Sequence, residues 1–484
     1  MQIFFILAIP ILLLAITWLI KDKKILGLFT CLAYFTVLAL SAWLLKEVAL
    51  SAQTKSFFGL VYLDTLSVFF IFVISVIALA VAIYSVGYLR REEEEGIISA
   101  KKIKVYYLLF NSFCLSMFIV PAVNNLGILW VAIEMTTLIS AFLVGFYNTK
   151  QSVEAAWKYI IICSVGIIFA LLGTILFSYA FSISGLSKSL NWSDIAPVAH
   201  ILDKNILKIA FIFILVGYGT KAGLAPMHTW LPDAHSQAPA PISALLSGVL
   251  LKTALYAILR FGIITIKGVG FAYFSKLMIL FGVLSLVISG GFILVQKDLK
   301  RLLAYSSIEH IGIIAIGFGL GTPLAVMGAA LHVFNHAVAK SLMFFGAGNI
   351  INLYKKHNMN AIKGVINAAP FTGIMVLMGV FILTGFPPFS LFISEIMIII
   401  SAFVKGAYFT GALILIFLSV VFSGFIYHFG KMLFGNLPKG MAPVHEPLSM
   451  KISFLFLFLP LCGMAIPFLI FGKDWLWWLQ RLLQ

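Results

Sequence analysis

Apolar residues run along this chain in long stretches that are separated by short polar connections. A helix that crosses a lipid bilayer needs about 20 mostly apolar residues. The stretches of that length predict an all-α polytopic membrane protein with roughly 14 transmembrane helices. The predicted spans lie near residues 3–20, 25–45, 62–88, 104–121, 125–147, 156–181, 207–231, 240–264, 271–295, 303–321, 323–350, 370–403, 408–434 and 450–472.

The composition excludes a water-soluble fold. Hydrophobic residues make up 62% of the 484 positions, charged residues make up 10%, and the mean hydropathy is +1.10. A soluble domain does not have this balance. The longest polar connections, near 88–104 and 182–206, are too short to fold independently.

The net charge of +16 indicates a membrane orientation rather than nucleic-acid binding, because the basic residues are spread over short connections. Roughly 18 Lys and Arg residues lie on the odd-numbered connections and roughly 10 on the opposite face. The positive-inside rule then places both termini outside the cytoplasm. The acidic run EEEE at 92–95 is expected to be a solvated loop, with a docking surface for a soluble partner as the alternative.

The four cysteines fall in apolar spans and have neither iron–sulfur nor zinc-site spacing. Buried packing is therefore expected for each of them. The sequence predicts no redox centre, no metal site and no cofactor on this chain. The cysteines are Cys31, Cys114, Cys163 and Cys462.

Two predicted spans carry proline inside an apolar run, with an ionisable residue nearby. Pro226 follows Lys221, and Pro387 and Pro388 precede Glu395. Proline interrupts a membrane helix, so helices 7 and 12 are expected to be broken. Paired breaks indicate inverted repeats, here spans 4–8 and 9–13. The predicted units are three N-terminal helices (1–103), two five-helix repeats (104–268 and 269–434) and a C-terminal helix with an interfacial tail (435–484).

Ionisable residues lie deep in several spans, where a charge is costly and normally faces a partner or a hydrated cavity. His332, His336 and Lys340 are each four residues apart, so one helix face carries all three. Histidine titrates near neutrality and can accept and release protons. The predicted proton-translocating residues are Glu134, Lys221, Lys252, His310, His332, His336, Lys340 and Glu395.

Glu134 and Lys221 are expected to lie close together, so that their separation loads or ejects a proton. A lysine held away from water gives up its proton more readily, and a nearby carboxylate restores the charged form. The break at Pro226 would add water and mobility. The alternative is that such pairs only lock helices together, which explains single residues better than the whole set.

A second group of ionisable residues lies near the same spans. A structural role is expected for Asp233 and Glu309, which lie nearer helix ends. The secondary candidates are His228, Asp233, His235, Lys158 and Glu309.

The segment TKAGLAPMHTWLPDAHSQAPAPISALLSGVLLKTALYAILRF, residues 220–261, resembles the core of the antiporter-like subunits of complex I and of Mrp-type cation/proton antiporters. QKDLKRLLAYSSIEHIGIIAIG and GFPPFSLFISE carry the same resemblance. EAAWKYIIICSVGIIFALLGT, SSIEHIG and PPFSLFISE are most similar to component F of hydrogenase-4 and formate-hydrogenlyase-type membrane complexes. The resemblance implies 14 spans, inverted repeats and a proton or sodium path along the membrane plane.

The resemblance also assigns roles to residues. It places the family's glutamate of span 5 on Glu134 and its lysines of spans 7 and 8 on Lys221 and Lys252. The distal position of span 12 falls on Glu395, where many family members carry lysine and the M-type subunit and component F carry glutamate. The polar connection between these positions matches His310, His332, His336 and Lys340.

The resulting hypothesis is a proton-translocating subunit of a multi-subunit respiratory hydrogenase or complex I-related complex in the inner membrane of a prokaryote. The implied partners are the lipid bilayer, other antiporter-like and small membrane subunits, and a hydrophilic redox module with Fe–S clusters and NiFe or quinone sites. No nucleic acid is expected. Two alternatives stay open: a Mrp-type Na⁺/H⁺ antiporter subunit without a redox partner, and a non-pumping membrane anchor.

Overall fold

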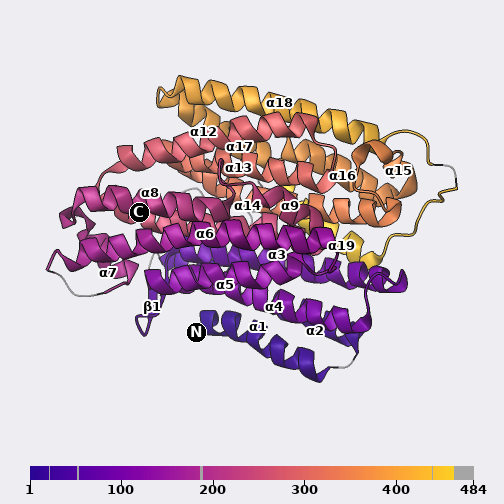
Figure 1. Cartoon of the computed structure of the whole chain (residues 1–484), viewed down its shortest axis with the longest axis horizontal. Coiled ribbons are helices and arrows are strands. Elements are labelled where there is room, and N and C mark those ends of the chain that lie inside the picture. The colour runs from indigo at the N-terminus through magenta and orange to yellow at the C-terminus, as the bar shows by residue number, and fades with distance from the viewer. Residues whose placement is uncertain (21, 52–53, 186–188, 439, 463–484) are drawn as a thin grey trace.

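Long helices lie side by side in the computed structural model, which describes residues 1–20, 22–51, 54–185, 189–438 and 440–462 (Figure 1). Within this described part, 11 helices are long and apolar enough to cross a membrane. The predicted all-α polytopic membrane fold is confirmed.

The first six long helices are unbroken. Side-chain caps at Asp64, Asn125 and Thr149 start three of them where the apolar runs begin. A short antiparallel hairpin, β1 (Lys55–Phe57) and β2 (Val61–Leu63), joins the second helix to the third. The helices are α1 (Gln2–Leu19), α2 (Lys23–Ser51), α3 (Thr65–Glu94), α4 (Ala100–Ala122), α5 (Leu126–Val144) and α6 (Lys150–Ser182), followed by the short α7 (Trp192–Val198) and η1 (Ala199–Ile201).

The seventh and twelfth predicted spans are broken, as expected. Pro226 lies in the first break, and Pro387 and Pro388 lie in the second. Each preceding helix is followed by a left-handed glycine, Gly223 with φ +82° and Gly385 with φ +63°, which lets the chain turn out of the helix. The halves are α8 (Lys204–Ala222) and α9 (Trp230–Gln237), then α16 (Pro370–Leu383) and α17 (Ser390–Val404).

The remaining elements complete two series of five spans with the same order of unbroken and broken helices. The first series is α4, α5, α6, α8–α9 and α10–α11, and the second is α12, α13, α14, α16–α17 and α18. The inversion and the boundaries 104–268 and 269–434 stay predictions. The elements are α10 (Ala240–Leu245), the π-helical η2 (Leu246–Leu250), α11 (Leu251–Gly268), α12 (Phe271–Val295), α13 (Leu299–Leu320), α14 (Pro323–Tyr354), η3 (Met359–Ala361), α15 (Val365–Ala368), α18 (Tyr408–Leu433), α19 (Leu448–Phe458) and η4 (Leu459–Leu461).

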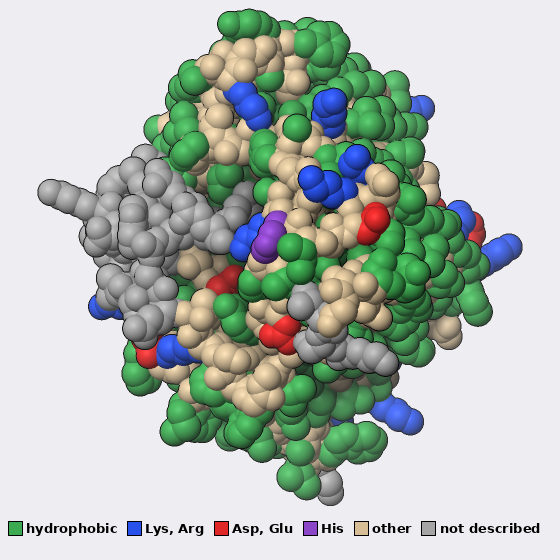
Figure 2. All heavy atoms as spheres, turned by 90° about the vertical axis from the view of Figure 1, so that its left-hand side faces the viewer, with side chains coloured by type: hydrophobic (Ala, Val, Ile, Leu, Met, Phe, Trp, Pro, Cys, Tyr) green, Lys and Arg blue, Asp and Glu red, His purple; other side chains and the backbone are tan. Residues whose placement is uncertain are grey.

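The centre of the bundle is made by α3, α10–α11, α13 and α14. The most apolar window of α10–α11 is 100% buried, whereas those of α1 and α18 are 28% and 33% buried. The outer helices therefore present apolar side chains to lipid or to partner subunits. Figure 2 shows one end of the bundle, where charged side chains gather near the middle and hydrophobic side chains cover much of the periphery.

The acidic run at 92–95 is not the solvated loop that the sequence predicts. Its first three residues form the last turn of α3. Glu92 is buried and accepts a hydrogen bond from Tyr147 Oη at 2.6 Å, Glu93 pairs with Lys23, and Glu95 pairs with Lys355. The helix extends past the membrane-length apolar run, so its acids reach basic residues on neighbouring connections.

The cysteine prediction is only partly correct. Cys114 and Cys163 are buried, Cys31 is half-buried and Cys462 is exposed. Cys462 directly follows η4 (Leu459–Leu461) at the end of the described chain. The predicted interfacial tail, DWLWWLQRLLQ, lies outside the described residues.

Candidate functional site: a buried row of ionisable side chains

Lys221 lies in the last turn of α8, directly before the first helix break, and is fully buried. Its ammonium donates to Thr137 Oγ1 on α5 and to Tyr159 Oη on α6, both at 2.7 Å. Tyr159 Oη is also hydrogen-bonded to Ser140 Oγ at 2.7 Å. Two hydroxyls from neighbouring helices thus solvate a charge that would otherwise be costly in this position.

Glu134 lies near enough to Lys221 for the two charges to interact, without a direct hydrogen bond between them. Its Oε1 accepts from Ser164 Oγ at 2.9 Å, and its buried Oε2 has no hydrogen-bond partner among the described residues. Thr137, one turn further along α5, occupies the position beside the ammonium. Hydroxyl groups accept two hydrogen bonds from the ammonium, and the loading of Lys221 by movement of Glu134 stays a prediction.

Lys252 follows the π-helical turn η2 in the most buried helix pair of the molecule. Its ammonium donates to the Ser247 carbonyl within that turn and lies 2.6 Å from His336 Nδ1 on α14. A protonated lysine can only donate, so Nδ1 accepts this hydrogen bond when Lys252 is charged. π-Helical turns are often found at functional sites.

Three buried histidines continue from Lys252. The rings of His336 and His310 have centroids 4.7 Å apart. His310 Nδ1 lies 3.0 Å from His332 Nε2, and His332 Nδ1 lies 2.9 Å from Ser394 Oγ on α17. His332, His336 and Lys340 lie on the continuous helix α14, which gives them the predicted common face. The rings of His332 and His336 stack nearly parallel, at 7° and 6.4 Å.

Glu395 ends this series at the second helix break. It is 3% exposed, and one ligand atom from each of His310, His332 and Glu395 lies within 4.8 Å of the others. A Cβ atom at Gly385 would overlap Glu395 Oε2, so the carboxylate lies directly against the backbone of the break. We call the series Lys252, His336, His310, His332 and Glu395 the distal row.

Glu309 and Lys340 lie beside the distal row. Glu309 lies in the middle of α13 rather than near its end, and both carboxylate oxygens are buried without a hydrogen-bond partner in the described chain. The expectation of a helix-end position is wrong because α13 begins at Leu299. Lys340, on α14, donates to the carbonyl of Leu303 on α13 at 2.9 Å.

The secondary candidates separate into two groups. Asp233 pairs with Lys158 at 3.3 Å and with Arg301 at one end of the bundle, which fits the structural role expected for it. His228 lies in the first break, and His235 is fully buried on α9 and stacks on Phe344 at 5.0 Å. Neither histidine contacts the distal row through a described hydrogen bond.

The sequence reading missed Arg260, although AILRF places it in an apolar run as clearly as Lys252. Arg260 is fully buried on α11 and pairs with Asp64 at the start of α3. It also donates to Ser67 Oγ and Tyr256 Oη, both at 2.8 Å. Thr137, Tyr159 and Ser394 were also missed, because hydroxyl residues within an apolar helix give no signal until their neighbours are known.

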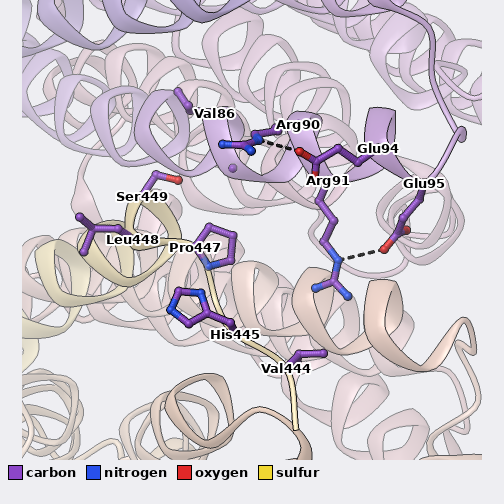
Figure 3. A pocket seen from close by; sticks show the side chains of 11 residues that line it. Val86, Arg90, Arg91, Glu94, Glu95, Val444, His445, Pro447, Leu448 and Ser449 are labelled. Atoms are coloured by element: carbon purple, nitrogen blue, oxygen red, sulfur yellow. Dashed lines mark hydrogen bonds and ion pairs between the residues drawn. The ribbon is translucent and has the colours of Figure 1, made fainter. Parts of the chain in front are cut away.

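Two cavities open near the C-terminal end of α3. One of about 410 Å³ is lined by polar residues that include Glu92, Lys300 and His357. The other, of about 700 Å³, lies between the end of α3 and residues 444–449 (Figure 3). In it Arg90 pairs with Glu94 opposite the ring of His445. Neither cavity is lined by a residue of the distal row.

Comparison with known proteins gives a consistent result. The family described as NADH:quinone oxidoreductase/Mrp antiporter, TM, matches residues 123–423, and the family described as NADH-Ubiquinone oxidoreductase (complex I), chain 5 N-terminus, matches residues 57–96. The chain is 36% identical over 406 residues to the hydrogenase-4 component F homolog of Methylacidiphilum infernorum (isolate V4), covering 84% of this chain and 85% of that relative.

Two solved structures share the fold. A chain of the membrane-bound sulfane sulfur reductase, an archaeal respiratory membrane complex, matches with a TM-score of 0.87 and 24% identity, covering 100% of this chain and 98% of that one. A chain of the Mrp complex from Dietzia sp. DQ12-45-1b matches with a TM-score of 0.83 and 17% identity, covering 100% and 99%.

Proposed function

The chain belongs to the NADH:quinone oxidoreductase/Mrp antiporter family of membrane subunits, and on that premise we propose that it translocates protons through its buried ionisable side chains. It is an antiporter-like membrane subunit of the kind found in respiratory complexes.

The observation that supports the proposal most strongly is the contact series of the distal row. Lys252 bonds His336 at 2.6 Å, and His310 bonds His332 at 3.0 Å. A neutral imidazole has one donor and one acceptor nitrogen, so it can receive a proton on one side and release it from the other. The distal row lines up five titratable groups from four helices. Holding four helices together does not require so many titratable groups in contact.

Lys221, with Thr137 and Tyr159, lies at the first helix break, as Glu395 of the distal row lies at the second. Its ammonium is held by hydroxyls that can also solvate a transferred proton. The Glu134 carboxylate, one turn away from Thr137, adjusts how strongly Lys221 holds its proton. Water at the break would connect this group to the distal row, since backbone groups freed by the break need polar partners.

The complex that we propose is a respiratory hydrogenase or a complex I-related assembly. The 36% identity to a hydrogenase-4 component F homolog supports it. In this assembly a hydrophilic partner module carries the Fe–S clusters and the NiFe or quinone sites, and its redox reactions shift charge along this subunit. A Mrp-type Na⁺/H⁺ antiporter is the second candidate, because the Mrp fold covers the whole chain; copurifying metal-binding subunits distinguish the two.

The proposed location is the inner membrane of a prokaryote, with both termini outside the cytoplasm. The excess of Lys and Arg on the odd-numbered connections supports this orientation.

Replacing Glu395 with glutamine or Lys221 with methionine tests the proposal in the intact complex reconstituted in vesicles. Both changes keep the side-chain size and remove the titration. We expect the rate of redox-driven proton uptake to fall about tenfold or more, equivalent to about 1.4 kcal/mol in the barrier, and fewer protons to be taken up per electron.

Matched controls are Glu154→Gln on α6 and Lys204→Met on α8, because both native side chains are exposed on the helices that carry Tyr159 and Lys221. Normal proton uptake in Glu395→Gln and Lys221→Met would contradict the proposal. Low yield of the complex with unchanged uptake per electron would support the anchor alternative.

A further inference from the structure

His310, His332 and Glu395 come from three different helices and converge at the second break. They lie on α13, α14 and α17, and one ligand atom from each lies within 4.8 Å of the others. No sequence spacing indicates this group, because its members are 22 and 63 residues apart along the chain.

One of these side chains carries a free buried atom. Glu395 Oε1 is buried and has no hydrogen-bond partner in the described residues. Buried polar atoms are normally paired, so an unpaired carboxylate oxygen beside two imidazoles calls for a ligand.

The surroundings hold the possible ligands in position. His332 Nδ1 is bonded to Ser394 Oγ at 2.9 Å, which turns Nε2 toward His310 Nδ1, 3.0 Å away; a bound cation would replace that contact. Metal-binding histidines commonly have their second nitrogen fixed in this way. On the other side, Gly385 gives the carboxylate of Glu395 room that a Cβ atom would fill.

The donor set selects a class of cation. Two imidazoles and one carboxylate suit Zn²⁺ and related first-row transition metals, whereas Na⁺-like and Ca²⁺-like cations prefer oxygen ligands. In a tetrahedral zinc site with bonds of about 2.0 Å, ligand atoms are roughly 3.3 Å apart. The present separations, within 4.8 Å, have to shorten to reach that spacing, and three protein ligands leave a fourth position on the cation for water.

We propose that His310, His332 and Glu395 form a binding site for a transition-metal cation of the Zn²⁺ type. Binding of the cation needs only these side chains. Its consequence rests on the proposed function: the cation takes the lone pairs that would carry the proton, joins α13, α14 and α17, and stops conduction through the distal row.

Zinc binding by the purified intact complex tests the site directly. After chelator treatment and dialysis, the complex is titrated with ZnCl₂ alone, bound zinc is measured by mass spectrometry, and ligation is read from zinc X-ray absorption. We expect one more zinc per complex in the wild type than in Glu395→Gln or His310→Gln, with nitrogen and oxygen ligands. Ser394→Ala should weaken binding about 10- to 100-fold.

His428→Gln is the matched control, because His428 is a mostly buried histidine on α18 away from the group; its zinc content should equal that of the wild type. If the Glu395→Gln complex does not assemble, the zinc content of Ser394→Ala and the zinc X-ray absorption spectrum of the wild type still test the site. Equal zinc in wild type, Glu395→Gln and Ser394→Ala would overturn the proposal.

Proton uptake measured with and without zinc separates this site from the proposed function. Zinc that binds at the site and slows uptake supports both. Zinc that binds at the site without slowing uptake supports the site and contradicts conduction through the distal row. Normal proton conduction that depends on Glu395, with no bound zinc, contradicts the site alone.

Discussion

At the scale of single residues, buried cations in this protein are solvated in two different ways. Lys221 and Lys252 bond uncharged groups, namely hydroxyls, a carbonyl and an imidazole. Arg260 instead pairs with the carboxylate of Asp64 and lies over the rings of Trp192 and Tyr256, at 4.2 and 4.8 Å. An ammonium without a counter-ion can lose its proton, whereas a paired guanidinium keeps its charge. The first arrangement suits transfer and the second suits structure.

Asp64→Asn should therefore destabilise the protein. The change leaves the buried Arg260 without its counter-charge, and breaking such a pair costs about 3–5 kcal/mol. Thermal unfolding in detergent at neutral pH measures the loss. Asp203→Asn is the control, because Asp203 likewise caps a helix but is exposed, and asparagine caps a helix as well as aspartate does. Equal melting temperatures for the two variants would contradict the structural role of Arg260.

The same pair predicts a pH dependence. Burial by itself would raise the pKa of the Asp64 carboxyl, but the Arg260 guanidinium outweighs burial and holds this pKa below its ordinary value. A lowered pKa in the folded state contributes stability above the unfolded value, about 3.9, that is lost as the pH falls through the folded value. The wild type should lose more melting temperature than Asp64→Asn on going below about pH 4, and parallel losses would contradict this.

At the scale of helices, each of the two breaks has an ionisable side chain close to the interrupted backbone. Lys221 precedes Gly223 in the first break, and Glu395 lies against Gly385 in the second. Proline explains why each helix stops. It does not explain why the ionisable side chain lies against the break. The left-handed glycine lets the chain turn and leaves space for the functional group.

Gly385→Ala should disturb Glu395 and reduce proton uptake about tenfold, or about 1.4 kcal/mol in the barrier, because the new Cβ would displace the carboxylate. Gly406→Ala is the matched control. Gly406 also has a positive φ, +78°, but open space around its Cβ position, so both variants carry the same backbone strain of about 1–2 kcal/mol. Equal uptake by the two variants in vesicles would show that the contact with Glu395 is unimportant.

At the scale of the whole molecule, polar contacts join the connections into two separate ends. Lys23 pairs with Glu93 and Lys355 pairs with Glu95, all on odd-numbered connections. At the opposite end Leu126 N bonds the Leu190 carbonyl at 2.9 Å. The chain therefore alternates between the ends, with each broken pair of helices counted as one span.

Cysteine labelling tests the proposed orientation of these ends. Lys356→Cys lies on an odd-numbered connection and Lys204→Cys on an even-numbered one, and both native side chains are exposed. In a background where the exposed Cys462 is replaced by serine, we expect a membrane-impermeant maleimide to label Lys204→Cys in intact cells and to spare Lys356→Cys until the cells are opened. The reverse pattern would invert the orientation.

The sequence by itself determined the membrane fold, the two broken helices and most of the buried ionisable residues. Each depends on local properties: apolar length, proline within a run, and a charge where water is absent. The histidine face of α14 also followed from spacing alone, because residues four apart share one side of any helix.

Only the tertiary structure decided what these side chains contact. It showed that hydroxyls from α5 and α6 hold Lys221 and that Glu309 lies at the centre of α13. It also showed that the acidic run at 92–95 ends α3, with Glu92 bonded to Tyr147 and the other three glutamates in ion pairs. It also brought His310, His332 and Glu395 together. The reason is physical: contacts between helices depend on which faces pack together, and packing is decided by side chains that are distant in the sequence.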